Sequence, residues 1–431
     1  MVPGAPSFFQ RQETGNTVAE NPNRQYWAHF FFICLGYAVW TSSRIGFPVG
    51  LSAMAKQFTW TSFEIGALST IFLLGQALID VPAGYWIDRF DRKLLICGSL
   101  VGIGISTLLV TISSGFWSAL FYRILFGVLE GVYNIAAFAV AGSILPGSRA
   151  LVNGMTQVFY GIGNYCGSTL VAALLQHHPG YWQLPLYWLG GLPIAYGVFS
   201  LYLFKRRYLR RFESSNALTD YGFAQTLGIV VRNIKVWQAI AIHACNIIPS
   251  WAILGMGNYI FVTYRHYDPV FSASVFGIGY GVGCLLVPLG TFWADRFGRR
   301  SVICVLGLWT AICAFVMFNV APPDWTMVAL CMCVAFGINA LYTLGYTITQ
   351  DAVSSASMSG IGIATGMAGG FGYLFAMLGG PLVGMLIPLF GPIWALNIVV
   401  SGSELLVVIF SAWFLRNDLP RMQSAIVETA R

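Results

Sequence analysis

The residues best suited to chemistry are ionisable side chains that interrupt long apolar stretches. In the segment RILFGVLEGVYN, four residues recur at intervals of three and four: Arg123, Gly127, Glu130 and Asn134. At 3.6 residues per turn they form one stripe on a helix, with Arg123 and Glu130 about 10 Å apart along its axis. Such a stripe could bind an anion and carry a proton. A structural ion pair with a neighbouring helix is the alternative.

Further ionisable residues lie in other apolar stretches, namely Arg44, Asp80, His243 and Glu404. An ionisable group within a bilayer is costly and rare, so it is functional by default. Arg44 stays charged and needs a carboxylate, an anionic substrate or water beside it. Asp80 and His243 have packing roles as alternatives, and no role is predicted for Glu404.

The composition places these charges in a membrane protein. Of 431 residues, 57% are hydrophobic and 9% are charged, whereas soluble domains carry about 25% charged residues. The nine cysteines have no metal-ligand spacing, so we expect no metal site and no cofactor. The sequence lacks the phosphate-binding motif of ATP-driven pumps, which indicates an ion gradient as the energy source.

The long apolar runs predict an all-α membrane protein. A membrane-spanning helix needs about 20 apolar residues. Twelve such runs occur, at 27–52, 64–88, 94–113, 117–141, 152–175, 184–205, 236–263, 270–294, 301–321, 325–349, 359–388 and 393–415. The longest polar stretch divides them into two six-helix bundles. The predicted parts are a tail at 1–26, a bundle at 27–205, a linker at 206–235, a bundle at 236–416 and a tail at 417–431.

The basic residues predict the orientation in the membrane. With both termini in the cytoplasm, most of the 23 Lys and Arg residues fall on cytoplasmic segments, and Lys56 and Arg265 lie outside. We therefore expect a multi-pass protein of the plasma or inner membrane. Its basic residues would lie beside anionic lipid headgroups, which accounts for the net charge of +7 without nucleic acid. We expect it to be a monomer.

A charged phrase occurs once in each predicted bundle. WIDRFDRK begins at Trp86 and WADRFGRR begins at Trp293, each at the end of an apolar run. Extended to GYWIDRFDRK from Gly84, it resembles the Gly-x-x-x-Asp-Arg-x-Gly-Arg-Lys/Arg signature between helices 2 and 3 of the major facilitator superfamily. Asp91 stands where that family prefers Gly, and Thr291 stands where the second copy should have Gly; Gly298 keeps the second glycine.

The resemblance covers nearly the whole chain and implies the major facilitator fold, with twelve transmembrane helices in two six-helix bundles. It implies a secondary transporter and not an enzyme. In the family the signature holds the two halves together in one state and releases them in the other. It thereby implies a conformational latch of Gly84, Asp88, Arg89, Arg92, Asp295, Arg296 and Arg299. Topological anchoring alone is the alternative.

Arg44 in the first helix, with Arg123 and Glu130 in the fourth, resembles the anion:cation symporter branch of the superfamily. That branch includes bacterial sugar-acid symporters and vesicular glutamate transporters. The resemblance implies that Arg44 and Arg123 bind the anion and that Glu130 carries the coupled proton. Bacterial members often have Asp before the first Arg, where this chain has Ser43. Asp80 could supply that missing proton-coupling carboxylate.

The resemblance also implies a cavity lined by polar side chains from both halves. The candidate substrate-binding residues, besides the two arginines, are Tyr37, Trp40, Gln157, Asn164, Asn246, Asn339 and Tyr342. Tyr160 and Tyr346 lie on the same predicted faces. Amides in mid-membrane need partners. The second half has almost no charge at depth, which argues against a strongly polyanionic substrate.

These features predict proton-coupled transport of a small organic anion, such as a monocarboxylate, a sugar acid or an aromatic acid. The alternative is a proton-coupled exporter of neutral or drug-like solutes. A receptor or a membrane enzyme on the same scaffold is a third class, which no catalytic arrangement of residues supports. The glycine-rich eleventh run, with Pro381, predicts a bend there.

Overall fold

The computed structural model describes residues 22–60, 62–144, 148–178, 180–205, 222–257, 260–261, 264–320, 324–354 and 361–415. The described residues are largely helical and include no strand. They contain twelve helical segments that are long and apolar enough to cross a membrane. The predicted all-α fold with twelve transmembrane helices is confirmed. The predicted tails lie outside the described residues, except for 22–26.

The first six spans form the half of the molecule that we call the N-half. Its helices are α1 (Pro22–Phe58), α2 (Ser62–Thr70), α3 (Phe72–Arg89), α4 (Arg92–Val110), α5 (Phe116–Ile144), α6 (Arg149–His177) and α7 (Gln183–Leu203). The second span consists of α2 and α3 together, which are separated at Ile71.

The last six spans form the C-half. Its helices are α10 (Ile234–Ala252), η2 (Ile253–Gly257), α12 (Pro269–Ser274), η3 (Val275–Gly279), α13 (Tyr280–Leu285), α14 (Val287–Phe297), α15 (Arg299–Asn319), α16 (Trp325–Ser354), α17 (Ile361–Ala376), α18 (Gly379–Phe390) and α19 (Pro392–Phe414). The short segments η2 and η3 are π-helical. The predicted bend in the eleventh span is the break between α17 and α18, which Pro381 follows.

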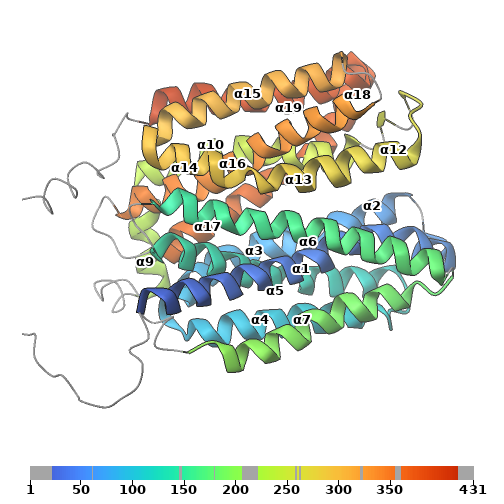
Figure 1. Ribbon diagram of the computed structural model, residues 1–431, viewed down its shortest axis with the longest axis horizontal. Coiled ribbons are helices and arrows are strands. Elements are labelled where there is room, and N and C mark those ends of the chain that lie inside the picture. The colour runs from blue at the N-terminus through green and yellow to red at the C-terminus, as the bar shows by residue number, and fades with distance from the viewer. Residues whose placement is uncertain are drawn as a thin grey trace, which may run out of the picture.

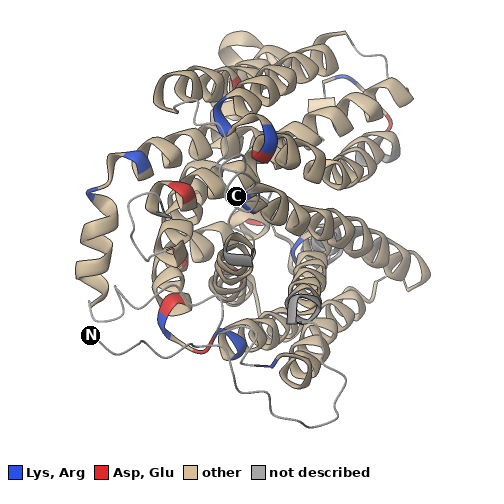
Figure 2. Ribbon diagram, turned by 60° about the vertical axis from the view of Figure 1, so that its left-hand side comes forward, with Lys and Arg blue, Asp and Glu red and all other residues tan. Residues whose placement is uncertain are grey.

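Figure 1 shows the two halves side by side, with α9 (Phe223–Val231) at one end of the bundle. The predicted linker therefore contains a short helix, and α10 begins inside its predicted range. Val230 of α9 packs with residues near the ends of α3, α16 and α17. We call this end of the molecule the α9 end. Charged residues gather there in Figure 2, at the α3–α4 and α14–α15 connections.

The two halves touch closely because small residues face each other. Gly84 of α3 lies against Gly362 of α17, and a methyl carbon added to Gly84 would lie 2.1 Å from the Gly362 carbonyl oxygen. In the second copy Thr291 of α14 lies against Gly154 of α6, where an added methyl carbon would lie 2.2 Å from the threonine hydroxyl. The missing glycine of the repeat is thus replaced by a glycine on the opposite helix.

The other departure from the family signature also has a local explanation. Gly298, between α14 and α15, has a φ of 95°, which favours glycine. The corresponding Asp91 has a φ of −63° and accepts a hydrogen bond from the Lys93 N–H at 3.0 Å. Asp91 therefore caps the start of α4, and this turn does not need a glycine.

Candidate functional site

A small cavity lies between the two halves. It is lined by Tyr37, Arg44, Gln157, Tyr160, Asn246, Ile247, Ser250, Trp251, Ile338, Asn339, Tyr342 and Tyr373. Helical periodicity explains why the polar residues share one wall. On α1, α6 and α16 they recur at intervals of seven, three and three residues, respectively, which places them on one face of each helix.

Six of the nine predicted substrate-binding residues line this cavity. They are Tyr37, Arg44, Gln157, Asn246, Asn339 and Tyr342. Four of these six are uncharged and buried, as Arg44 is: Tyr37, Gln157, Asn246 and Asn339. The described lining residues that come from the C-half carry no charge. The cavity therefore offers one cation on the N-half and neutral hydrogen-bonding groups on the C-half.

Arg44 forms an ion pair with Glu130 at the cavity wall. The Arg44 Nη1 donates to Glu130 Oε1 at 2.8 Å, and the side chains are 3% and 0% exposed. Glu130 Oε2 and Arg44 Nε are both buried without a hydrogen-bond partner. A buried pair with polar atoms left over is less stable than a fully satisfied one and can exchange partners.

Aromatic rings surround the Arg44 guanidinium from both halves. Its central carbon lies 4.7 Å from the ring centroid of Phe72 on α3 and 4.8 Å from that of Trp251 on α10. These cation–π contacts stabilise the charge without neutralising it. Arg44 therefore stays a cation that a ligand carboxylate can approach from the cavity.

Arg123 differs from the prediction because it does not line the cavity. Its guanidinium lies 4.1, 4.6 and 5.0 Å from the ring centroids of Phe47, Phe126 and Phe72. Its Nε and Nη2 atoms are buried without a hydrogen-bond partner. We predicted an anion beside the Arg123 guanidinium. In the structure, phenylalanine rings lie there instead.

Trp40 and Asn164 also lie outside the cavity lining. Trp40 is fully buried, with its ring centroid 4.8 Å from that of Tyr37. Asn164 is 9% exposed and lies one turn beyond Tyr160 on α6, in electrostatic contact with it. Each of them contacts a residue that lines the cavity, Tyr37 or Tyr160.

Hydroxyl groups from the two halves are joined into a chain beside the cavity. Tyr37 donates to Asn134 Oδ1 at 2.7 Å, and Asn134 Nδ2 donates to the Tyr346 hydroxyl at 3.3 Å. The Tyr342 hydroxyl lies 3.2 Å from that of Tyr346 and 2.7 Å from that of Tyr373. The chain connects α1 and α5 of the N-half to α16 and α17 of the C-half.

The candidate His243 lies behind this chain. Its ring centroid is 4.8 Å from that of Tyr346 and 5.3 Å from that of Tyr342, and its side chain is fully buried. A methyl carbon on Gly345 would lie 1.9 Å from its Nδ1, so a glycine makes the room for the imidazole. His243 packs against the tyrosines and does not line the cavity.

The first copy of the repeated phrase lies between the two halves at the α9 end. Asp88 Oδ1 accepts a hydrogen bond at 3.3 Å from the N–H of Gly362, at the start of α17. A helix N-terminus favours a negative charge because its first N–H groups are unsatisfied. Arg92 donates to the Ile87 carbonyl oxygen at 3.1 Å, and Arg89 is exposed with its guanidinium over the Tyr85 ring.

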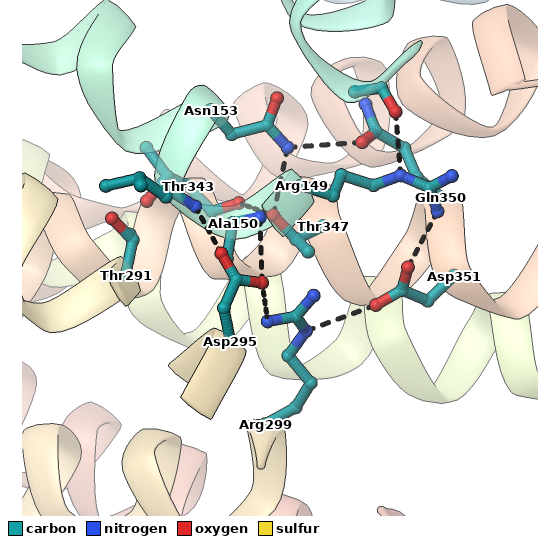
Figure 3. A network of polar contacts seen from close by, with 12 residues as sticks. Arg149, Ala150, Asn153, Thr291, Asp295, Arg299, Thr343, Thr347, Gln350 and Asp351 are labelled. Carbon is teal, nitrogen blue, oxygen red and sulfur yellow. Dashed lines mark hydrogen bonds and ion pairs between the residues drawn. The ribbon is translucent and has the colours of Figure 1, made fainter. Parts of the chain in front are cut away.

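The second copy repeats this arrangement in the opposite sense (Figure 3). Asp295 of α14 accepts hydrogen bonds from the N–H groups of Ala150 and Leu151, at 3.3 and 2.8 Å. These groups begin α6 of the N-half. Arg299 forms an ion pair with Asp295, and Arg296 is exposed over the Phe297 ring.

Asp351 of α16 extends the second copy into a network. Its Oδ1 lies 2.7 Å from Arg149 Nη1 of the N-half, and its Oδ2 lies 3.2 Å from Arg299 Nε of the C-half. Figure 3 shows Gln350 and Asn153 beside it, with Asn153 Nδ2 donating to Gln350 Oε1 at 3.1 Å. The α9 end is therefore closed by polar contacts between the halves.

Sequence reasoning missed several residues of the site. Ser250, Trp251 and Tyr373 line the cavity, and Asp351 bridges the halves. Ser250 lies one helical turn after the predicted Asn246, so extending that face along α10 would have found it. Tyr373 stands out as a polar side chain within a glycine-rich run. Asp351 lies just after the predicted span at 325–349, and nothing in the sequence indicated that it would contact the other half.

The sequence profile described as Major Facilitator Superfamily matches residues 30–361 and 271–429. The chain belongs to the Major Facilitator Superfamily. This confirms the predicted family, and with it the class of membrane transporters and not of enzymes. The repeated Asp-Arg phrase, the two six-helix halves and the central cavity of this superfamily member agree with that assignment.

Two curated relatives of this superfamily member are named as transporters. The chain is 28% identical over 271 residues to the voltage-gated purine nucleotide uniporter SLC17A9 of Mus musculus, covering 56% of this chain and 58% of the relative. It is 25% identical over 232 residues to the probable anion transporter 6, chloroplastic, of Arabidopsis thaliana, covering 50% and 44%. The chain thus spans about half the length of these curated relatives.

A solved structure shows the same fold. It is a crystal structure of a variant of the E. coli fucose:proton symporter FucP, with a TM-score of 0.67 and 13% sequence identity. The superposition covers 91% of this chain and 100% of that chain. The likeness confirms that the superfamily member has the major facilitator fold.

Proposed function

We propose that the protein is a secondary active transporter that moves a small organic anion, coupled to protons, by alternating access. The substrate would be a monocarboxylate, a sugar acid or an aromatic acid. The observation that carries this proposal is the buried Arg44–Glu130 ion pair in the wall of the cavity between the two halves.

The coupling follows from competition for one guanidinium. When Glu130 takes up a proton, it loses its charge and releases Arg44. A substrate carboxylate can then pair with Arg44, so that the cavity stays electrically balanced. When Glu130 loses the proton, it pairs with Arg44 again and displaces the substrate. Proton and anion therefore travel together.

The other contacts orient the substrate. Tyr37, Gln157, Asn246, Asn339 and Tyr342 are proposed to hydrogen-bond its uncharged part, because their side chains line the cavity. Trp40 and Asn164 would support that wall from behind. Arg123 is left out of the proposed contacts, since it does not line the cavity and its guanidinium lies against phenylalanine rings.

The charge of the cavity supports a small monoanion. Arg44 is the one charged side chain among the described residues that line it, and it already faces Glu130. A substrate with several negative charges would need additional cations. The relatives' names, an anion transporter and a nucleotide uniporter, favour an anionic substrate for this chain.

The repeated Asp-Arg phrase is proposed to act as the latch that closes the α9 end. Both of its aspartates contact the start of a helix in the opposite half, and these contacts must break when the cavity opens there. We place the α9 end and both termini in the cytoplasm on the positive-inside rule. The protein would work as a monomer in the plasma or inner membrane.

A proton-coupled exporter of neutral or drug-like solutes is the second candidate. The aromatic residues Tyr37, Tyr160, Trp251, Tyr342 and Tyr373 on the cavity wall favour it. The two candidates differ in their need for Arg44, because only an anionic substrate pairs with its charge.

The test is uptake into proteoliposomes that contain the purified protein. Labelled gluconate, glucuronate, benzoate and pyruvate would be offered with an inward proton gradient and without one. Accumulation of one of these acids, driven by the gradient and lost in Arg44→Gln, is the expected result. Transport of neutral aromatic solutes that survives Arg44→Gln would instead select the exporter.

A further inference from the structure

Asp80 of α3 is a fully buried carboxyl that the cavity does not explain. Neither of its oxygens has a hydrogen-bond partner, and it does not line the cavity. A methyl carbon added to Gly131 of α5 would lie 2.5 Å from its Oδ1, and one added to Gly369 of α17 would lie 2.3 Å from its Oδ2. The carboxyl thus fills a niche between one helix of each half.

This niche lies on the seam along which α3 packs against α17. Along α17, glycines at one-turn intervals meet α3: Gly362 faces Gly84, Gly366 faces the Asp80 carbonyl oxygen, and Gly370 faces the Ala77 carbonyl oxygen. The latch contact from Asp88 lies at the α9 end of the same seam. Any opening of the α9 end that separates α3 from α17 therefore exposes Asp80.

The charged and titratable groups that face Asp80 come from four helices. They are Arg44 of α1, Glu130 of α5, Tyr346 of α16 and Tyr373 of α17. None of them is hydrogen-bonded to its carboxyl oxygens. The Arg44 charge is already paired with Glu130. Asp80 therefore has no counter-ion of its own.

An ionised carboxylate in this niche would carry a large desolvation cost with no hydrogen bond to offset it. The neutral acid carries a much smaller cost. We propose that Asp80 is a second proton-binding site, separate from Glu130, whose proton is bound while α3 packs on α17 and is released when the two helices part. Whether Asp80 holds this proton then determines whether the latch at the α9 end stays closed.

The direction of the pH effect follows from linkage. The packed state holds the proton and the separated state can lose it to water. Acid therefore favours the packed α9 end, and alkali favours separation. Asn has the shape of the neutral acid and cannot ionise, so Asp80→Asn should keep the seam packed at every pH.

The conformation can be measured without a substrate. Spin labels would be placed at Leu94→Cys on α4 and Ile234→Cys on α10, which are 53% and 65% exposed at the α9 end of opposite halves. The exposed Cys166 would be replaced by serine. Electron–electron distances would be recorded in lipid nanodiscs between about pH 5 and about pH 9, the range in which buried carboxyls titrate.

A matched control is available in Glu404 of α19. It is also fully buried with neither carboxyl oxygen hydrogen-bonded, but α19 does not take part in the seam. We expect the distance in the unsubstituted background to lengthen as the pH rises. Glu404→Gln should keep this transition, and Asp80→Asn should lose it and stay at the short distance.

Three results would overturn the proposal: no pH response in the unsubstituted background, the same response in Asp80→Asn, or loss of the response in Glu404→Gln. The first of these needs no Asp80 variant, so the test stands even if that variant does not fold. Because no anion is present, failure of the proposed organic-anion transport would leave these distances unchanged. The two proposals can therefore fail separately.

Discussion

Arg44 and Glu130 form an ion pair that is incompletely satisfied, which distinguishes it from a structural ion pair. Each side chain keeps a buried polar atom without a partner, Arg44 Nε and Glu130 Oε2. Structural pairs in protein interiors usually satisfy their remaining polar atoms with further hydrogen bonds. Two unpartnered polar atoms on one ion pair are what we expect at a site where a proton and a substrate carboxylate bind and leave.

Glu130→Gln tests the proton-carrying role at this pair. Gln keeps the shape but cannot release a proton, so Arg44 stays free for the substrate. We expect proton-driven accumulation of the transported acid to fall at least about tenfold, while exchange of labelled for unlabelled acid at equal pH continues. Uptake and counterflow in proteoliposomes would measure both.

Glu404→Gln serves as the matched control for that experiment, since it removes another fully buried carboxyl that does not line the cavity. It should leave accumulation within about twofold of the unsubstituted protein. Intact accumulation in Glu130→Gln would exclude Glu130 as the coupling group.

The ion pair also makes a prediction about stability. Arg44→Gln leaves Glu130 buried without its counter-ion, which should destabilise the fold by about 3–5 kcal/mol. Adding Glu130→Gln removes the uncompensated charge, so the double variant should recover most of that loss. Thermal unfolding in detergent would measure it. Equal losses in the single and double variants would show that the guanidinium, and not the charge balance, sustains the packing.

At the scale of helices, the two copies of the repeat achieve the same close contact between opposite halves in two different ways. Two helices from opposite halves approach closely when one of them has a glycine at the contact. In the first copy that glycine is Gly84 on the repeat itself, and in the second it is Gly154 on α6, opposite Thr291. The departure from the family signature therefore relocates the small residue and keeps the contact.

A swap of side chains tests this interpretation. Gly154→Ala would place a methyl carbon 2.2 Å from the Thr291 hydroxyl, so α6 and α14 should separate and transport should fall at least about fivefold. Gly154→Ala combined with Thr291→Gly moves the glycine back to the repeat and should recover most of the activity. Thr291→Gly alone is the control. Failure of the double variant to recover would mean that the contact needs the threonine hydroxyl.

The sequence predicted the helices and their inward faces well, because both follow from periodicity. The apolar runs located all twelve spans to within a few residues, and the spacing of Gln157 and Tyr160 indicated the face of α6 that lines the cavity. Contacts between different helices could not be predicted in this way. Arg123 shares a stripe with Glu130, but two of the three phenylalanines that surround it, Phe47 and Phe72, come from other helices.

At the scale of the whole molecule, the α9 end is closed by two related contacts. Asp88 of the N-half meets the start of α17, and Asp295 of the C-half meets the start of α6. Each half therefore supplies one carboxylate and one helix N-terminus. Under the proposed alternating access, a rigid-body rotation of one half against the other would break both contacts together.

A substitution at Asp351 tests this closure directly. Asp351 alone in the described network pairs with one arginine of each half, Arg149 and Arg299. Its side chain is 38% exposed, so the bridge contributes about 1 kcal/mol. Asp351→Asn should therefore raise the ratio of the open to the closed α9 end about fivefold. Spin-label distances between the halves would show this as a larger long-distance population. Asp268→Asn, which alters a helix-capping aspartate at the start of α12, is the control and should leave the ratio unchanged. An unchanged ratio in Asp351→Asn would show that the two helix-terminal aspartates hold the α9 end closed without the bridge.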